Sequence, residues 1–113
     1  QVTLTILNNA IDALVAKDIN NAKISISSFK EENFIIINIQ DNALGIDDKV
    51  IDKIFDPYFT TKHKSQGTGI GLYMSHQIIS KHMDGQIEVS NSKYKYKNEK
   101  FEGALFTITF YGE

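Results

Sequence analysis

The chain opens with an amphipathic pattern of helical period. Between Val2 and Leu14 the apolar residues recur at steps of three and four positions, at Ile6, Leu7, Ala10 and Ile11. Residues with this spacing share one side of an α-helix. The sequence therefore predicts a helix from Val2 to Leu14 that packs on a hydrophobic core.

Two β-strands are predicted next, because the hydrophobic period shortens to alternation. Residues 22–29 alternate, with Ile24 and Ile26 expected to face inward and serines between them. Residues 34–39 are almost continuously apolar and β-branched, which indicates a central strand covered on at least one face. The polar residues 31–33 have turn chemistry, so the two strands are expected to form an antiparallel hairpin.

Two helices are predicted in the second half. A short helix is expected over residues 49–54, ahead of Pro57. Residues 70–83 carry apolar side chains at helical spacing, and Gly85 follows as a stop signal. The chain therefore returns to helix after the first pair of strands.

Two last strands, over residues 86–90 and 105–110, are predicted from alternation, with a polar loop over residues 91–102 between them. Strands and helices thus come in pairs, without the strict alternation of a parallel doubly wound sheet. The order predicts a two-layer α/β sandwich, in which helices pack on one face of a mixed, mostly antiparallel sheet.

Composition fits this fold and excludes several kinds of site. The 113 residues suit a single domain, 1–113, with 42% hydrophobic and 23% charged residues. A net charge of −2 favours neither nucleic acid nor an anionic membrane as a partner. The chain has no cysteine, which excludes disulfides and thiolate chemistry. It also has no arginine, so a phosphate would be bound by lysine, backbone amides or a metal ion.

We also expect no direct membrane contact, because no apolar run approaches the roughly 20 residues of a membrane span. The first residue, Gln1, already lies inside the amphipathic pattern. We therefore expect the chain to be part of a longer protein.

A run of alternate glycines, G-T-G-I-G-L at residues 67–72, precedes the long predicted helix. Bare backbone amides at a helix N-terminus attract anions, so the run could bind phosphate. The alternative is a flexible hinge ahead of the helix.

A polar turn, D-N-A-L-G-I, follows the central strand. Asp41 shares its parity with Ile39, so its carboxylate should leave the strand on the inward face. A carboxylate accepts hydrogen bonds, which suits an exocyclic amino group such as that of adenine, and Gly45 would let the backbone approach a flat ring. The alternative is an ordinary turn at a strand end.

Two other stretches could contribute chemistry. Asn9 lies beside the buried row of the first helix, and its amide oxygen is a hard ligand suited to Mg²⁺; otherwise it is a solvent-facing or capping residue. In I-F-D-P-Y-F-T-T-K, residues 54–62, aromatic residues surround Pro57. This stretch is either a packing anchor for a lid or an ordinary surface loop.

Along the chain these four stretches are Asn9, residues 41–46, residues 54–62 and residues 67–72. In that order and spacing they closely resemble the ATP-binding domain of bacterial sensor histidine kinases. These belong to the GHKL ATPase superfamily (HATPase_c), with DNA gyrase, mismatch-repair and heat-shock chaperone ATPases. The F-D-P-Y-F-T-T-K run, leading through a short lid at about residues 58–66 into the glycines, is similar to the histidine kinase branch.

The resemblance implies that the domain binds Mg·ATP and donates the γ-phosphoryl group to a histidine on a separate dimerisation domain of the same protein. A response regulator would act downstream. The isolated domain would be a monomer, the full-length protein a homodimer, and the location cytoplasmic.

The resemblance also implies roles for single residues. Asn9 matches the ligand of Mg²⁺, and Asp41 matches the acceptor from the adenine amino group. The other implied ATP-binding residues lie beside the base, in the aromatic box, in the lid or along the phosphates: Gly45, Ile46, Phe55, Phe59, Lys62, Gly67, Thr68, Gly69, Ile70, Gly71 and Leu72.

Two positions depart from the family pattern. Thr5 stands where an asparagine is usual, one turn before Asn9, which reduces any supporting polar contact. Ala43 replaces the usual first glycine after Asp41. A positive φ at Ala43 would cost on the order of 1 kcal/mol, whereas a negative φ would cost nothing.

None of the three histidines has the context of a phosphate acceptor, which is expected outside this chain. His76 should be a half-buried packing residue, His82 lies near a helix end, and His63 lies in the lid. The basic and aromatic K-Y-K-Y-K, residues 93–97, could bind nucleic acid, but a solvated loop suits the acidic net charge better.

Two other functions stay open on the sequence. The chain could be a GHKL interaction module that responds to ATP without transferring phosphate. It could also belong to a GHKL serine kinase of the anti-sigma-factor type. The residues that precede Gln1 in the longer protein would distinguish these classes.

Overall fold

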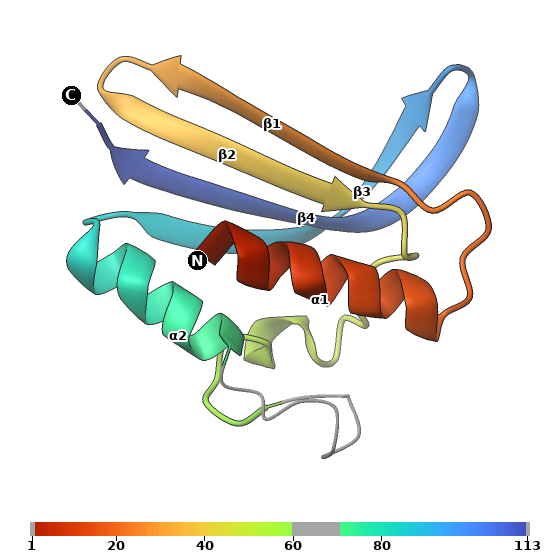
Figure 1. The fold of residues 1–113 in the computed structure, drawn as a ribbon, viewed down its shortest axis with the longest axis horizontal. Helices are drawn as coiled ribbons and strands as arrows, with labels where there is room; N and C mark the ends of the chain where they lie inside the picture. The colour runs from red at the N-terminus through yellow and green to blue at the C-terminus, as the bar shows by residue number, and fades with distance from the viewer. Residues whose placement is uncertain (1, 60–70, 113) are drawn as a thin grey trace.

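The computed structural model describes residues 2–59 and 71–112. Their helices and strands follow the predicted order (Figure 1). The elements are α1 Val2–Ala16, β1 Ile24–Glu31, β2 Phe34–Asp41, the 3₁₀ turn η1 Ile51–Lys53, α2 Gly71–Gln77, the π-helical turn η2 Ile78–His82, β3 Gln86–Tyr96 and β4 Glu99–Tyr111.

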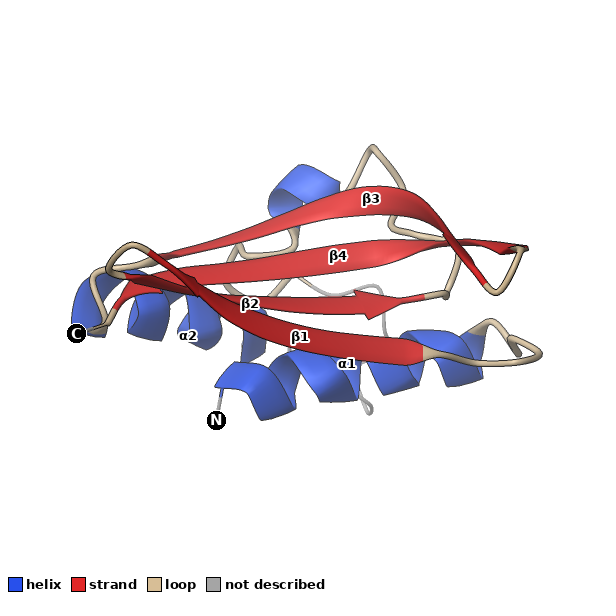
Figure 2. Ribbon diagram, turned by 90° about the horizontal axis from the view of Figure 1, so that it is seen from above, coloured by secondary structure: helices blue, strands red, loops and turns tan. Residues whose placement is uncertain are grey.

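The strands form a single four-stranded sheet in the order β1-β2-β4-β3, and every pairing in it is antiparallel (Figure 2). The mostly antiparallel sheet predicted from the sequence is therefore wholly antiparallel in the described residues. β2 pairs with β1 and with β4, which confirms it as a central strand.

The helices cover one face of the sheet, as predicted (Figures 1 and 2). The helix α1 buries Val2, Ile6, Ala10 and Leu14, which recur every fourth residue and so lie along one side. Ile6 meets Ile39 of β2 and Ile108 of β4 in the centre of the core. The amphipathic period of the first helix therefore fixes which side of it contacts the sheet.

The predicted inward orientation of Ile26 is confirmed, but its side chain is not buried. Ile26 lies on β1 opposite the buried Ile39 of β2, so its side chain points to the helical side of the sheet. It nevertheless remains 53% exposed. The physical reason is that β1 is an edge strand, and the helices pack on the centre of the sheet rather than on this edge.

The polar loop predicted over residues 91–102 is wrong. β3 and β4 continue as paired strands almost to their tip, where Lys97 and Asn98 have φ of 49° and 67°. Two successive left-handed residues form the tight turn that suits a two-residue hairpin. The K-Y-K-Y-K run is therefore mostly strand, and it was missed because its side chains are largely exposed.

The long helix ends as predicted but changes its winding. After α2 the chain forms the π-helical turn η2, in which the N–H of Met83 donates to the carbonyl of Ile78 at 3.2 Å. Gly85 follows the helix, and a Cβ there would lie 2.3 Å from the carbonyl oxygen of Thr109. Glycine at this position therefore lets the helix return closely onto β4.

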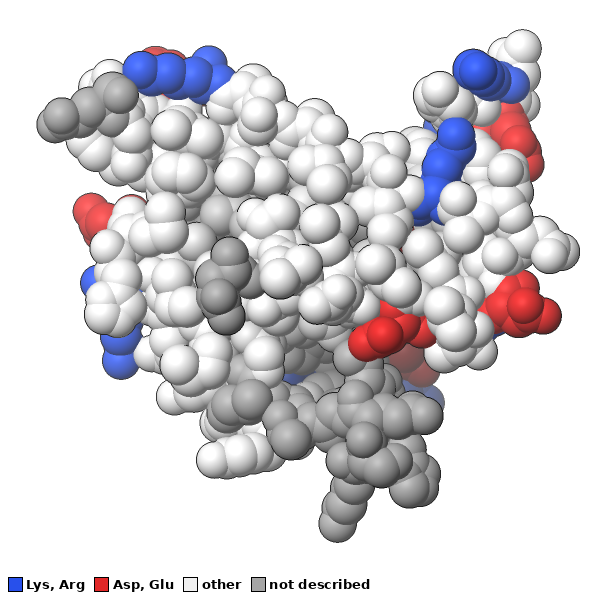
Figure 3. Space-filling view, viewed as in Figure 1, with Lys and Arg blue, Asp and Glu red and all other residues white. Residues whose placement is uncertain are grey.

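Few charged side chains lie on the face of the molecule centred on α1 (Figure 3). Lysines and acidic residues gather instead at its edges. None of the described helices is long and apolar enough to span a bilayer.

Candidate functional site

The structure describes some of the sequence-predicted site residues and not others. Those it describes are Asn9, Asp41, Gly45, Ile46, Phe55, Phe59, Gly71 and Leu72. Outside the described residues lie Lys62, His63, Gly67, Thr68, Gly69, Ile70 and all of the predicted lid beyond Phe59.

Asp41 is the last residue of β2 and is only 4% exposed. One of its carboxylate oxygens, Oδ1, accepts the backbone N–H of Ala43 at 3.0 Å and that of Ala104 at 3.1 Å. No described group donates to Oδ2, and the described residues contain no fully buried side-chain oxygen without a partner. Asp41 therefore has one oxygen fixed by the backbone and one that reaches the surface.

Gly103 on β4 packs directly against Asp41, a contact that the sequence analysis did not predict. A Cβ on Gly103 would lie 1.8 Å from the carbonyl oxygen of Asp41 and 2.7 Å from its Oδ1. A glycine inside a strand often marks such a close approach of two backbones. That signal is hard to recognise in the sequence, because Gly103 falls between the predicted loop, residues 91–102, and the predicted strand, residues 105–110.

The loop 42–46 follows Asp41. Leu44 and Gly45 have φ of 70° and 87°, whereas the φ of Ala43 is not positive. The replacement of the usual glycine by Ala43 therefore costs no backbone strain. Asn42 fastens the start of the loop, because its Oδ1 accepts the backbone N–H of Lys23 at 2.7 Å and its Nδ2 donates to the carbonyl of Asn21 at 3.0 Å.

Asn9 is half-buried on α1, and its Nδ2 donates to the carbonyl of Thr5 at 2.9 Å. The amide oxygen therefore points away from the preceding turn of the helix. A Cβ on Gly71 would lie 3.2 Å from the Cγ2 of Thr5, so α1 contacts the first residue of α2. The fold thus brings the helix of the predicted magnesium ligand to the last of the predicted phosphate-side glycines.

The described residues contain no group of three or more His, Cys, Asp or Glu side chains that could hold a metal ion. Asn9 as a magnesium ligand therefore stays a prediction, which rests on its hard amide oxygen.

Two of the aromatic residues around Pro57, Phe55 and Phe59, pack on the core, whereas Tyr58 is 75% exposed. The ring of Phe55 lies 5.4 Å from that of His76 and 6.3 Å from that of Phe106, measured between centroids. Phe59 is partly buried against the same core cluster. The fold supports the packing-anchor interpretation of this stretch, and it confirms His76 as a half-buried packing residue.

Tyr94 on β3 contacts Asp41 through the backbone. Its hydroxyl donates to the carbonyl oxygen of Asp41 at 3.3 Å, and its ring stacks on Phe101 with centroids 5.5 Å apart. Burial, and then the negative charge of Asp41, raise the pKa of the Tyr94 phenol above 10.0. The folded chain therefore favours the neutral phenol.

Tyr94→Phe is expected to reduce the loss of stability at alkaline pH. Because the folded state raises the pKa of Tyr94, its stabilising contribution is complete below the unfolded value of 10.0 and is lost as pH rises through the folded value. Urea unfolding at about pH 8 and about pH 11 measures the difference. An equal fall of the unfolding free energy in wild type and variant would contradict the assignment.

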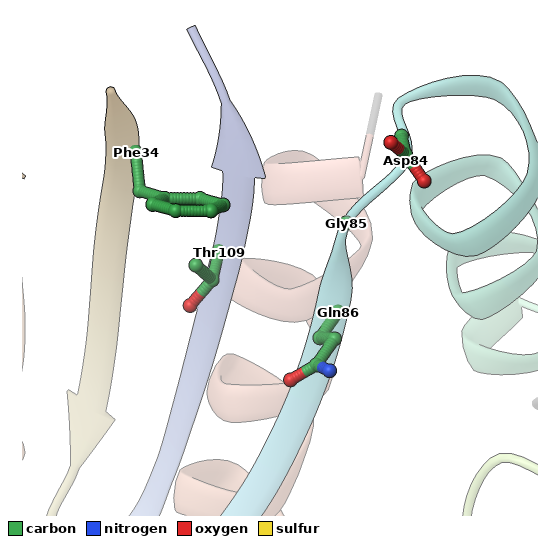
Figure 4. A pocket seen from close by; sticks show the side chains of 5 residues that line it. All are labelled: Phe34, Asp84, Gly85, Gln86 and Thr109. Atoms are coloured by element: carbon green, nitrogen blue, oxygen red, sulfur yellow. The ribbon is translucent and has the colours of Figure 1, made fainter. Parts of the chain in front are cut away.

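A surface pocket lies far from these residues. It is lined by Phe34, Asp84, Gly85, Gln86 and Thr109 (Figure 4). Phe34 begins β2, whereas Asp41 ends it, so the pocket lies toward the opposite end of the sheet. It contains none of the sequence-predicted site residues.

Comparisons with known proteins agree with this geometry. Residues 1–111 match the family model described as "Histidine kinase-, DNA gyrase B-, and HSP90-like ATPase". The two-component sensor PprA of Pseudomonas aeruginosa is 32% identical over 111 residues, which is 96% of this chain and 11% of that protein. The signal transduction histidine-protein kinase AtoS of Escherichia coli is 44% identical over 92 residues, 80% of this chain and 14% of that protein.

Solved structures show the same fold. The nucleotide-free catalytic domain of the histidine kinase ThkA superimposes with a TM-score of 0.74 at 29% identity, covering 98% of this chain and 64% of that one. The chain spans only a small part of the curated relatives it matches, 11% and 14% of the two named above. By sequence and by fold, the chain belongs to the histidine kinase-, DNA gyrase B- and HSP90-like ATPase family, in which it is similar to the catalytic domains of sensor histidine kinases.

Proposed function

We propose that this chain is the ATP-binding catalytic domain, residues 1–113, of a longer sensor histidine kinase. It binds Mg·ATP, and the γ-phosphoryl group passes to a histidine on a separate dimerisation domain of the same protein. The observation that carries this proposal is Asp41, a buried carboxylate with one oxygen fixed by two backbone N–H groups and the other at the surface.

Asp41 would read the adenine base. Its fixed oxygen prevents rotation of the carboxylate, so Oδ2 stands ready to accept a hydrogen bond from the adenine amino group. Guanine presents a carbonyl oxygen at the same position, and two acceptors facing each other would repel. Gly45 and Ile46, in the loop that follows, would lie beside the base.

The phosphates would lie toward the start of α2. With no arginine in the chain, they would be bound by Lys62 and by the backbone amides of the glycine run, from Gly67 to Gly71. Asn9 would hold the magnesium ion through its amide oxygen. A bound Mg²⁺ offsets the negative charge of the phosphates.

Phosphoryl transfer requires little covalent chemistry from this domain. A histidine nitrogen of the acceptor attacks the γ-phosphorus, the bond to the β-phosphate oxygen breaks, and ADP leaves. Catalysis of this step rests mainly on positioning and on stabilisation of charge. The domain would act in the cytoplasm, in a homodimeric protein, and the phosphoryl group would continue to a response regulator.

Calorimetric titration with ATP, with and without Mg²⁺, tests the binding function and the role of Asn9 together. Wild type is expected to bind ATP more tightly when Mg²⁺ is present. Asn9→Ala removes the amide oxygen and should abolish this dependence, with a loss of affinity on the order of tenfold. An Asn9→Ala variant that keeps the wild-type response to Mg²⁺ would refute the metal site.

The transfer step is measured on the full-length protein with γ-labelled ATP. Phosphate on a histidine is labile in acid and stable in base, which distinguishes it from phosphoserine. Label on a serine would indicate the serine-kinase function instead. ATP binding with no labelled residue would indicate an ATP-gated interaction module.

A further inference from the structure

The loop 42–46 has a conformation that its own side chains do little to hold. Leu44 and Gly45 are successive left-handed residues, and Leu44 has a β-carbon that disfavours this region. The Leu44 side chain is 62% exposed, so burial contributes little to fixing it. Contacts from other elements must therefore hold the loop. One is a backbone bond, from the N–H of Leu44 to the carbonyl of Glu102 at 3.0 Å.

Lys17, directly after α1, provides a second contact. Its Nζ donates to the carbonyl of Ala43 at 2.7 Å and to that of Gly45 at 2.8 Å. These carbonyls flank Leu44, so one ammonium group fixes the backbone on both sides of the left-handed residue. Hydrogen bonds from an ammonium group are charge-assisted and stronger than neutral ones.

Asn91 on β3 provides a third contact. Its Oδ1 accepts the backbone N–H of Ile46 and its Nδ2 donates to the carbonyl of the same residue, both at 2.7 Å. A Cβ on Gly45 would lie 2.8 Å from this Oδ1, so the side chain of Asn91 packs closely against the backbone of the loop. Asn91 thereby fixes the end of the loop while Lys17 fixes its middle.

We propose that Lys17 and Asn91 are positioning residues for nucleotide binding. They hold the loop 42–46 in the conformation that binds adenine, and they do not contact ATP themselves. Holding the loop before the ligand arrives lowers the conformational entropy that binding would otherwise cost. This inference rests on the proposed function, but its first test does not.

The first test is amide hydrogen exchange in the nucleotide-free chain. Lys17→Met removes the ammonium group but leaves the acceptors of the Leu44 and Ile46 amides in place. If Lys17 orders the loop, both amides should exchange about tenfold faster in the variant. Unchanged exchange would overturn the proposal, whatever the chain binds. Asn91→Ala provides the same test at the Leu44 amide should Lys17→Met fail to fold.

The second test is ATP binding by calorimetry. Lys17→Met and Asn91→Ala should each weaken ATP binding about tenfold, and the ratio of affinities with and without Mg²⁺ should not change. Lys17→Arg, which still carries donors for both carbonyls, should restore affinity to within about threefold of wild type. Lys30→Met, at the exposed far end of β1, is the control for the loss of one positive charge.

The outcomes separate this inference from the proposed function. A wild-type chain that does not bind ATP would refute the function, and hydrogen exchange would still decide whether Lys17 orders the loop. A wild-type chain that binds ATP and a Lys17→Met variant that binds it equally well would refute the positioning role alone. An equal loss of affinity in Lys30→Met would also refute it, because the effect would then be one of net charge.

Discussion

Asp41→Asn is expected to weaken ATP binding by about tenfold to a hundredfold, equivalent to about 1.5–3 kcal/mol. The asparagine oxygen can still accept from the N–H groups of Ala43 and Ala104, so the fold should change little. The other position then carries an NH₂ group, which donates. Donor would face donor at the adenine amino group, and the hydrogen bond proposed to select adenine would be lost.

The same substitution should improve the relative binding of GTP, because an NH₂ group can donate to the guanine carbonyl oxygen. Calorimetry with both nucleotides measures the ratio of the ATP affinity to the GTP affinity, which should be smaller in the variant than in wild type. Asp48→Asn, at an exposed position after the loop, is the matched control and should bind as wild type. Equal binding of ATP and GTP by the wild-type chain would contradict the role of Asp41.

Asp41→Ala is a less specific change. It would leave the N–H groups of Ala43 and Ala104 without their acceptor in a buried position, at a cost of about 1–3 kcal/mol for each unsatisfied group. A loss of ATP binding in that variant would combine a damaged fold with a missing contact. Asparagine therefore tests recognition, whereas alanine tests stability as well.

Gly103→Ala is expected to cause a large loss of stability. The added Cβ would lie 1.8 Å from the carbonyl oxygen of Asp41 and 2.5 Å from its carbonyl carbon, both backbone atoms. The neighbouring backbones of β2 and β4 must then separate. Overpacking of this kind costs about 3 kcal/mol or more, which corresponds to a fall of the melting temperature on the order of 10 °C.

Thermal unfolding followed by circular dichroism measures this loss of stability. ATP binding below the melting transition shows whether the displaced Asp41 still binds adenine. Gly112→Ala is the control, because its Cβ would meet the end of the flexible Ile35 side chain, 2.4 Å away, instead of backbone. It should lower the melting temperature far less. Equal melting temperatures for Gly103→Ala and wild type would show that the strands can separate without cost.

The arrangement of the fold was largely predictable from local patterns. The first helix, the hairpin that joins the first two strands and the central position of the second strand all follow from the period of the hydrophobic residues. The pattern failed at the paired tip of β3 and β4, where most side chains are exposed although Phe101 is buried. The ends of β3 and β4 carry mostly exposed side chains, so their alternation does not separate buried from exposed positions. Their extended pairing depends on the partner strand and on the tight turn at Lys97 and Asn98.

The sequence by itself determined the layers of this protein, its family and the residue types of the candidate site. Those features are encoded by the spacing of hydrophobic residues and by short motifs, both of which involve only residues close together in the sequence. Only the tertiary structure decided that Gly103 lies against Asp41, and that Lys17 and Asn91 hold the loop 42–46. These contacts join residues at least 26 positions apart in the chain. No local pattern records them, because each arises only once the helix and the strands have packed together.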